Sequence, residues 1–239
     1  MISAGRTDKG KKRGNNQDCI FVSDNPLGPL PNLYIVADGM GGHAAGDFAS
    51  RYAISIMLDF IRKSNVTNPI SLLKRAMILA SNEVYKEAEK DKEKLGMGTT
   101  MVACVIDDRE AYIANIGDSR LYIIDNDIRQ ITLDHSLVEE LIRNGQLERN
   151  RGRNHPEKNI ITRAMGSRDE AMPDFFQITL DPGSRILMCS DGLSNMVEND
   201  EIKDIILEAP SPQAAVDELV DKANYYGGND NISVIVIGV

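Results

Sequence analysis

The stretch LYIVADGMGGH, residues 33–43, joins an apolar strand-like run to a helical pattern that begins at residue 44. The run 33–37 ends directly on Asp38, and Gly39 follows it. An Asp-Gly pair usually joins two strands of a hairpin, whereas here it leads into a helix across three glycines. The spacing of these glycines does not match the fingerprint of dinucleotide-binding folds. Because glycine lets a backbone approach a ligand closely, this loop is a candidate binding site.

Three further aspartates lie at the ends of strand-like runs. Asp191 ends the run in RILMCSDGL, and Asp230 precedes the run in GGNDNISVIV. Asp118, in ANIGDSRLY, lies in a predicted hairpin turn. Each of them alone is more often a turn residue. Together with Asp38, they could converge on one rim of a sheet.

Converging carboxylates repel one another unless cations lie between them. The candidate ligands are all hard oxygens without an accompanying cysteine or histidine set, and such ligands favour Mg²⁺ or Mn²⁺ over Zn²⁺ or copper. Divalent ions of this kind can activate water as a nucleophile and hold phosphoryl oxygens. The pattern therefore suggests hydrolysis of a phosphoester.

The other runs indicate an α+β fold. Between residues 99 and 132, strand-like runs are joined by turns too short for parallel crossovers, so they are predicted to be antiparallel. Clustered helices and clustered strands favour α+β over alternating α/β. The predicted strands are 19–23, 33–37, 99–106, 111–116, 120–125, 128–132, 174–180, 184–190 and 232–239. The predicted helices are 44–63, 69–94, 134–144, 200–208 (with Asn199 as its cap) and 212–226.

The composition argues against several function classes. The chain has 239 residues, of which 42% are hydrophobic, and a formal net charge of -9. This acidic balance argues against a nucleic-acid binder and against adhesion to an anionic membrane. We expect a cytoplasmic protein without membrane insertion, because no signal-peptide core and no bilayer-spanning run occur. Cys19, Cys104 and Cys189 form no C-x-x-C motif, so they do not indicate a zinc site.

Eight motifs follow one another in the order of one known family: TDKGKKRGNNQD, VADGMGGHAAGD, GMGTTMVA, ANIGDSRLY, LDHSLVEEL, NHPEKNIITRAMG, LMCSDGL and GGNDNISVIV. In this ordered set the chain resembles the type 2C metal-dependent serine/threonine protein phosphatases (the PPM family) in their small bacterial form. The resemblance implies a four-layer α/β/β/α sandwich of two antiparallel sheets flanked by helix pairs. It also implies a single catalytic domain over residues 1–239, with a surface insertion, or flap, near 145–170.

The resemblance implies a metal centre of two Mn²⁺ or Mg²⁺ ions, with a weaker third. Asp38 would bridge the two ions, and the carbonyl oxygen of Gly39 would bind one of them. Asp191 and Asp230 would bind the other. Asp118, helped by Asp191, matches the ligand of the third ion.

Three more residues receive roles from the resemblance. Arg13 matches the arginine that binds the substrate phosphate, and its fixed fork of donors suits that task. Asp18 would accept a hydrogen bond from coordinated water. Gln17 stands where many relatives carry glutamate, so it could only hydrogen-bond such a water. The implied mechanism is direct in-line attack of water or hydroxide on phosphorus, with Asp38, Asp191 and Arg13 in catalytic positions.

One departure concerns the general acid. Met40 stands where eukaryotic members carry a histidine proposed for that role, so the role cannot be transferred. His43 could replace it, although a histidine held by loop packing or capping is the simpler interpretation.

The resulting functional hypothesis is a phosphatase that removes phosphate from phosphoserine and phosphothreonine in proteins. We expect it to be a monomer that opposes a bacterial serine/threonine kinase and acts on that kinase and its substrates. Two alternatives remain at this point. The chain could be a regulatory binding module that has lost turnover, or a stress-response phosphatase with one dedicated anti-sigma antagonist as substrate.

Overall fold

The computed structural model describes residues 1–42, 45–167 and 172–239. The strands are β1 (Ile2–Asp8), β2 (Asp18–Ser23), β3 (Leu33–Met40), β4 (Gly98–Thr99), β5 (Met101–Asp107), β6 (Glu110–Ile116), β7 (Arg120–Ile124), β8 (Ile128–Gln130), β9 (Asp174–Thr179), β10 (Arg185–Cys189) and β11 (Ile232–Gly238). The helices are α1 (Ala45–Lys63), α2 (Pro69–Lys90), α3 (Leu137–Arg143), α4 (Arg149–Gly152), α5 (Asp191–Ser194), α6 (Asn199–Glu208), α7 (Pro212–Tyr225) and the short 3₁₀ helix η1 (Lys92–Lys94).

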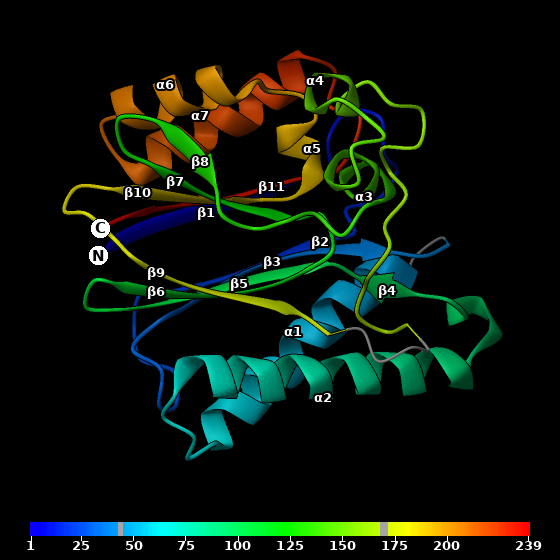
Figure 1. Ribbon diagram of the computed structural model, residues 1–239. Coiled ribbons are helices and arrows are strands. Elements are labelled where there is room, and N and C mark those ends of the chain that lie inside the picture. The colour runs from blue at the N-terminus through cyan, green and yellow to red at the C-terminus, as the bar shows by residue number, and fades with distance from the viewer. Residues whose placement is uncertain (43–44, 168–171) are drawn as a thin grey trace.

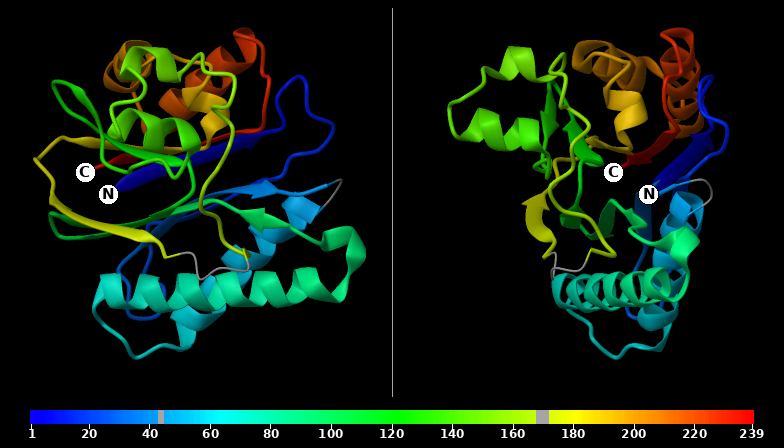
Figure 2. Two further views of the ribbon diagram at one scale, coloured as in Figure 1. Left: turned by 45° about the vertical axis from the view of Figure 1, so that its right-hand side comes forward. Right: turned by 90° about the vertical axis from the view of Figure 1, so that its right-hand side faces the viewer.

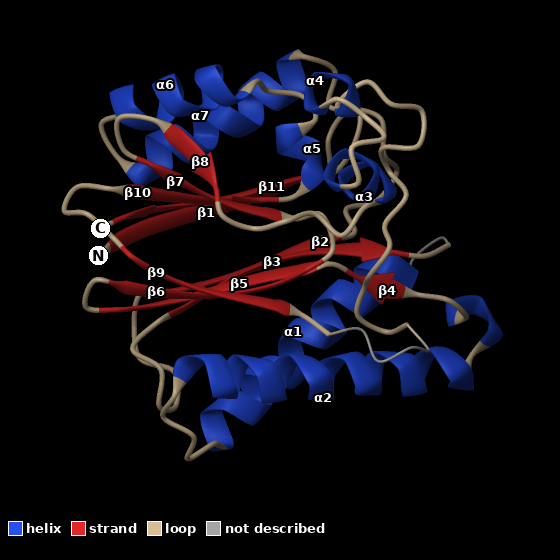
Figure 3. Ribbon diagram, in the orientation of Figure 1, coloured by secondary structure: helices blue, strands red, loops and turns tan. Residues whose placement is uncertain are grey.

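Across the described residues, the strands form two antiparallel sheets that pack face to face (Figures 1 and 3). The first sheet has the strand order β1-β11-β10-β7-β8. The second has the order β2-β3-β5-β6-β9, with β4 paired to β3. Helices α6 and α7 cover the outer face of the first sheet, and α1 and α2 cover that of the second (Figures 1 and 2). The predicted α+β sandwich with helix pairs on both faces is confirmed.

Strand β3 explains why the central strands are apolar without alternation. Its residues Leu33 and Ile35 pack in the core beneath α1 and α2, whereas Tyr34 and Val36 pack in the core between the sheets. Successive side chains of a strand point to opposite faces, and both faces of this sheet are covered. Residues 33–37 of β3 are therefore all buried, and such burial stabilises the layers by about 25 cal/mol for each Å² of apolar surface removed from water.

The predicted hairpin at residues 111–125 is wrong. Strand β6 belongs to the second sheet and β7 to the first, so the connection at 117–119 crosses between the sheets. Gly117 turns the chain there with φ +101°, and a Cβ on it would lie 2.5 Å from the side chain of Thr100. Asp118 therefore occupies a corner between the two sheets at one end of the sandwich.

Other differences are local. Strand β1 was not predicted, because ISAGRTD carries few of the β-branched and aromatic residues that mark strands. It is held instead by antiparallel pairing with β11. The predicted helix 69–94 ends at Lys90, where Asp91 leaves helical geometry and caps η1. Asn199 is the first residue of α6 rather than its cap, which is Glu198.

The predicted insertion at 145–170 contains α4, and its residues 168–170 lie outside the described ranges, as does His43. Cys104 and Cys189 are buried free thiols, as their apolar surroundings suggest. Within the described ranges, no helix is long and apolar enough to cross a membrane.

Candidate metal centre

Strand register brings three aspartates to the same end of the strands of the first sheet. The end of β10 pairs with the start of β11 and with the start of β7. Asp191 lies two residues after the end of β10, Asp230 lies two residues before β11, and Asp118 lies two residues before β7. Antiparallel pairing therefore places all three carboxylates at the same end of the sandwich, opposite the chain termini (Figure 1).

The second sheet supplies two more carboxylates at the same end. Asp18 begins β2 and pairs across the ladder with Asp38 in β3. The Asp38 backbone is held on the other side, where its carbonyl oxygen accepts hydrogen bonds from Thr100 N at 2.8 Å and Thr99 Oγ1 at 2.9 Å. These contacts fix the position of the Asp38 backbone at the same end of the sandwich as Asp118, Asp191 and Asp230.

A pocket of about 220 Å³ lies between the two sheets, at the end where these aspartates are found. Every predicted site residue except Asp18 lines this pocket. Its lining residues are Arg13, Gln17, Asp38, Gly39, Met40, Gly41, Asp118, Asn159, Ile161, Asp191, Asp230 and Asn231.

The charged forms of the Asp18 and Asp38 side chains are disfavoured in this buried site. Burial raises the pKa of Asp18 to about 7, although a hydrogen bond from Ser190 Oγ at 2.7 Å acts in the opposite direction. Burial also raises the pKa of Asp38 well above its usual range, and the neighbouring charges of Asp18 and Asp191 add to that effect. The site therefore favours an added positive charge.

Asp118 and Asp191 show the same behaviour. Burial raises the pKa of Asp118 well above its usual range, with a further contribution from the charge of Asp191. Burial and the charge of Asp230 raise the pKa of Asp191 to about 6. Among the described residues, one carboxylate oxygen of each has no hydrogen-bond partner, and the same holds for Oδ1 of Asp18. Such buried oxygens carry a desolvation cost that a bound cation would remove.

Gly39 is required by close packing of the chain against itself. A Cβ at this position would lie 2.0 Å from the carbonyl oxygen of Gly46 and 2.7 Å from that of Gln17. Its amide also donates to the Gln17 carbonyl oxygen at 3.1 Å. The absence of a side chain at Gly39 thus allows the start of α1 to pack against the loop before β2. This role is separate from the predicted contact of the Gly39 backbone with a ligand.

Arg13 lies beside a predicted metal ligand. Its Nη2 is 2.7 Å from Oδ2 of Asp230, and its side chain is about half exposed. This pair leaves several lone pairs of the Asp230 carboxylate available, because an ionised carboxylate offers about four acceptor sites. Gln17 lies at the same rim, where its Nε2 donates to the Gly41 carbonyl oxygen at 3.4 Å.

Two supporting residues were missed by sequence reasoning. Ser190 bonds to Asp18, as described above, and Asn231 bonds to the backbone of Gln17 at 2.8 Å. Each is the chain neighbour of a predicted ligand, Ser190 of Asp191 and Asn231 of Asp230. That adjacency is the signal that could have identified them.

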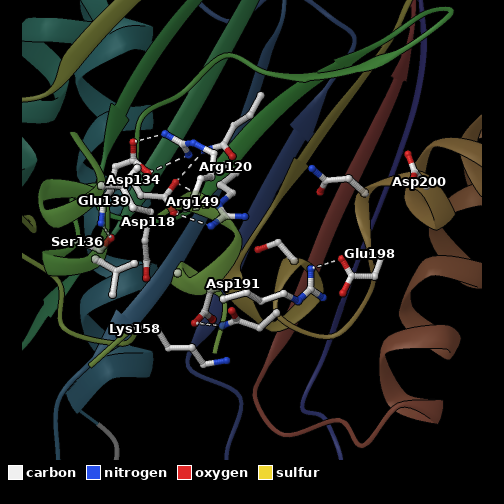
Figure 4. Close-up of a pocket in the computed structure, with 18 residues that line it drawn as sticks. Asp118, Arg120, Asp134, Ser136, Glu139, Arg149, Lys158, Asp191, Glu198 and Asp200 are labelled. Carbon is white, nitrogen blue, oxygen red and sulfur yellow. Dashed lines mark hydrogen bonds and ion pairs between the residues drawn. The ribbon is translucent and has the colours of Figure 1, made fainter. Parts of the chain in front are cut away.

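A second, polar pocket of about 420 Å³ adjoins the first, and Asp118 and Asp191 line both (Figure 4). The predicted insertion contributes Arg149 and Lys158 to its wall (Figure 4). Arg149 is occupied by an ion pair with Glu139 at 3.0 Å. The described part of the insertion therefore reaches the neighbourhood of the first pocket, but the charge of Arg149 is neutralised there.

Apart from the soft thioether sulfur of Met40, the side-chain atoms of the first pocket that could ligate a metal are oxygens, which suits Mg²⁺ or Mn²⁺. Over residues 1–42, 45–167 and 172–239, no three histidine, cysteine or carboxylate side chains form a group that could hold a metal ion as they stand. A centre here would therefore depend on backbone oxygen and water as well as on carboxylates, as is common for Mg²⁺.

Known proteins resemble this chain over nearly its whole length. A model of the protein phosphatase 2C family matches residues 8–222. The serine/threonine phosphatase stp of Listeria innocua is 39% identical over 242 residues, covering 99% of this chain and 95% of that protein.

Solved structures show the same agreement. The serine/threonine phosphatase Stp1 of Staphylococcus aureus gives a TM-score of 0.91 at 32% identity, covering 99% of this chain and 94% of that one. The catalytic domain of the phosphatase PstP, solved in complex with two manganese ions, gives 0.86 at 29% identity, covering 98% and 96%. The predicted resemblance is confirmed: the chain belongs to the protein phosphatase 2C family, the metal-dependent serine/threonine protein phosphatases.

Proposed function

We propose that this chain hydrolyses phosphoserine and phosphothreonine in proteins at a centre of two Mn²⁺ or Mg²⁺ ions. Asp38 and the Gly39 carbonyl oxygen would hold one ion, and Asp38, Asp191 and Asp230 would hold the other. Asp118, with Asp191, would bind a weaker third. The observation that carries the proposal is the convergence of four aspartates from both sheets on one pocket.

The fit of divalent cations rests on this chain's own chemistry. Buried oxygens of Asp118 and Asp191 lack partners among the described residues, and burial raises the pKa of both groups. Deprotonated carboxylates are the form that binds metal, so binding would release protons and relieve the repulsion. When bound, such ions supply an activated water nucleophile and neutralise charge on the phosphoryl oxygens.

The residues around the pocket offer hydrogen-bond donors and acceptors suited to binding a phosphate monoester. Arg13, half exposed at the rim, offers its guanidinium donors to the phosphate oxygens. Asp18, whose Oδ2 is fixed by Ser190, keeps its other oxygen available as an acceptor for a nearby water. Gln17 can donate or accept a hydrogen bond at the same rim, but it adds no negative charge.

The physiological role we propose is opposition to a bacterial serine/threonine kinase, with that kinase and its targets as substrates. The relatives named serine/threonine phosphatase support this role. We further propose that the chain acts as one catalytic domain, as a monomer and in the cytoplasm. The insertion near 145–170 overhangs the site and contributes to the choice of phosphoprotein.

The test is hydrolysis of a phosphothreonine peptide by the purified protein with added Mn²⁺. We expect phosphate release in Mn²⁺, none in EDTA, and recovery when Mn²⁺ is restored. Undiminished release in EDTA would overturn the metal mechanism. Metal binding by calorimetry without any hydrolysis would instead indicate a binding module that has lost turnover.

A further inference from the structure

A short basic segment of this acidic chain borders the pocket on which the four aspartates converge. This pocket is called the metal pocket below. Lys9, Lys11, Lys12 and Arg13 lie between β1 and β2, and we call residues 9–13 the basic loop. All four side chains belong to exposed residues. The chain as a whole carries a formal net charge of -9, so this concentration of cations is a local exception.

The backbone of the basic loop is fixed beside the metal pocket. The amides of Lys11 and Lys12 donate to the Gly228 carbonyl oxygen at 2.8 and 3.1 Å. Gly10 has φ +75°, and a Cβ on it would lie 2.1 Å from the carbonyl oxygen of Asp230. The loop is therefore packed directly against the turn that carries a proposed metal ligand.

The lysines of the basic loop have no acidic partner in the part of the chain that the structure describes. Among the residues that the structure describes, Lys9, Lys11 and Lys12 make no ion pair within 4.0 Å, whereas Arg13 pairs with Asp230. The arginines of the insertion behave differently, because most of them are neutralised by the fold. Their ion pairs are Arg149 with Glu139, Arg151 with Glu148, Arg153 with Glu198 and Arg163 with Asp174.

A hollow of about 250 Å³ connects the basic loop to the metal pocket. Its lining residues are Arg13, Gly14, Asn15, Gln17 and Gly41. Three of these, Arg13, Gln17 and Gly41, also line the metal pocket. A peptide whose phosphorylated residue enters the metal pocket can therefore extend over this hollow toward the lysines.

We propose that the basic loop selects phosphoprotein segments that carry acidic side chains beside the phosphorylated residue. This inference rests on the proposed function and names its substrate class. Unpaired cations held on a fixed backbone attract an acidic segment and orient it without first losing partners of their own. An extended peptide advances about 3.3–3.6 Å for each residue, so positions within about three residues of the phosphate can reach the loop.

The experiment compares two phosphothreonine peptides in Mn²⁺ that differ only in carrying three glutamates or three glutamines beside the phosphothreonine. We expect the wild type to show a kcat/KM about threefold to thirtyfold higher for the glutamate peptide, and this ratio to fall as salt screens the charges. The variant Lys9→Gln/Lys11→Gln/Lys12→Gln should lose most of this ratio. It should hydrolyse p-nitrophenyl phosphate at the wild-type rate.

A matched control removes three exposed cations far from the pocket. Lys63 is the last residue of α1, and Lys74 and Arg75 lie in the first turns of α2. The end of α1 and the start of α2 lie at the end of the helical layer away from β4 (Figure 1). The variant Lys63→Gln/Lys74→Gln/Arg75→Gln should keep the wild-type ratio. Equal kcat/KM for both peptides in the wild type, or an unchanged ratio in the loop variant, would overturn the inference. Failure of the wild type to hydrolyse either peptide would overturn the proposed function instead.

Discussion

The side-chain oxygen of Asn231 accepts a hydrogen bond from the backbone amide of Gln17 at 2.8 Å. The Nδ2 of the same side chain donates to the carbonyl oxygens of Lys9 at 2.8 Å and Asn15 at 3.0 Å. One buried carboxamide thus holds both ends of the segment that carries Arg13, and it follows Asp230 directly in the chain. The segment that carries Arg13, the proposed phosphate-binding arginine, is in this way positioned by the chain neighbour of Asp230, a proposed metal ligand.

Replacing Asn231 with aspartate should loosen that segment. Asn231→Asp keeps the shape but loses both donors, and it adds a carboxylate to an acidic site. Because two backbone carbonyl oxygens lose their partner, we expect a loss of about 1–3 kcal/mol in the free energy of unfolding. The KM for a phosphopeptide should rise more than kcat falls, since Arg13 is displaced from the phosphate. Urea unfolding and steady-state kinetics measure the two effects.

Asn32 provides the matched control, because it is also buried and also bridges backbone groups. Its side chain donates to the Ile106 carbonyl oxygen at 2.6 Å and accepts from the Ile106 amide at 2.8 Å. Asn32→Asp should lose comparable stability and leave KM unchanged. If both variants changed KM alike, Asn231 would have no special part in positioning Arg13.

Gly39 should not tolerate even a methyl group. Its Cβ would meet backbone oxygens of Gly46 and Gln17, which cannot move without shifting α1 or the loop before β2. We expect Gly39→Ala to cost about 1–3 kcal/mol of unfolding free energy, as overpacking usually does. A Cβ on Gly42, in the same glycine-rich loop, would meet no described atom within 4 Å. Gly42→Ala should stay within about 0.5 kcal/mol of the wild type. Equal thermal melting of the two variants would contradict the packing argument.

Sequence reasoning located the aspartates because each stands at the end of an apolar run, where strand register and motif order carry the information. It did not identify the sheet to which β6 and β7 belong, since a three-residue connection can close a hairpin or cross between layers. The distinction depends on Gly117, whose left-handed φ and close contact with Thr100 become visible only in the packed structure. Asn231 was missed for a related reason: its three hydrogen bonds reach residues more than 200 positions away.

The variant Asp38→Ala tests whether Asp38 binds metal or is needed for the fold. Removing a carboxylate whose pKa is raised by burial and by neighbouring charges should leave the metal-free protein as stable as the wild type, or more stable. Phosphopeptide hydrolysis should fall by about a hundredfold or more, because charge stabilisation at the reacting phosphate is lost. Mn²⁺ should raise the melting temperature of the wild type and have a smaller effect on the variant. A variant that is unfolded without metal would show that Asp38 is needed for the fold itself.

The pKa of Asp18 predicts how the metal-free protein responds to pH. Burial raises this pKa to about 7 in the folded state, from 3.8 as the ordinary value. Between these values the folded chain binds a proton that the unfolded chain has lost, so this residue's contribution to stability falls as pH rises through the interval. Asp191, with a pKa raised to about 6, acts in the same direction.

Asp18→Asn removes the titrating group and keeps an acceptor for Ser190. In EDTA, the variant should gain stability relative to the wild type, and that gain should be larger near pH 8 than near pH 5. Urea unfolding of both proteins at the two pH values measures the difference. Titrating groups remote from the site cancel because they are common to both, and loss of the Asp18 charge lowers the pKa of Asp38, which acts in the same direction. An equal gain at both values would mean that Asp18 does not hold its proton in the folded protein. With saturating Mn²⁺ the advantage at high pH should shrink or reverse, since metal binds the deprotonated site and stabilises the wild type.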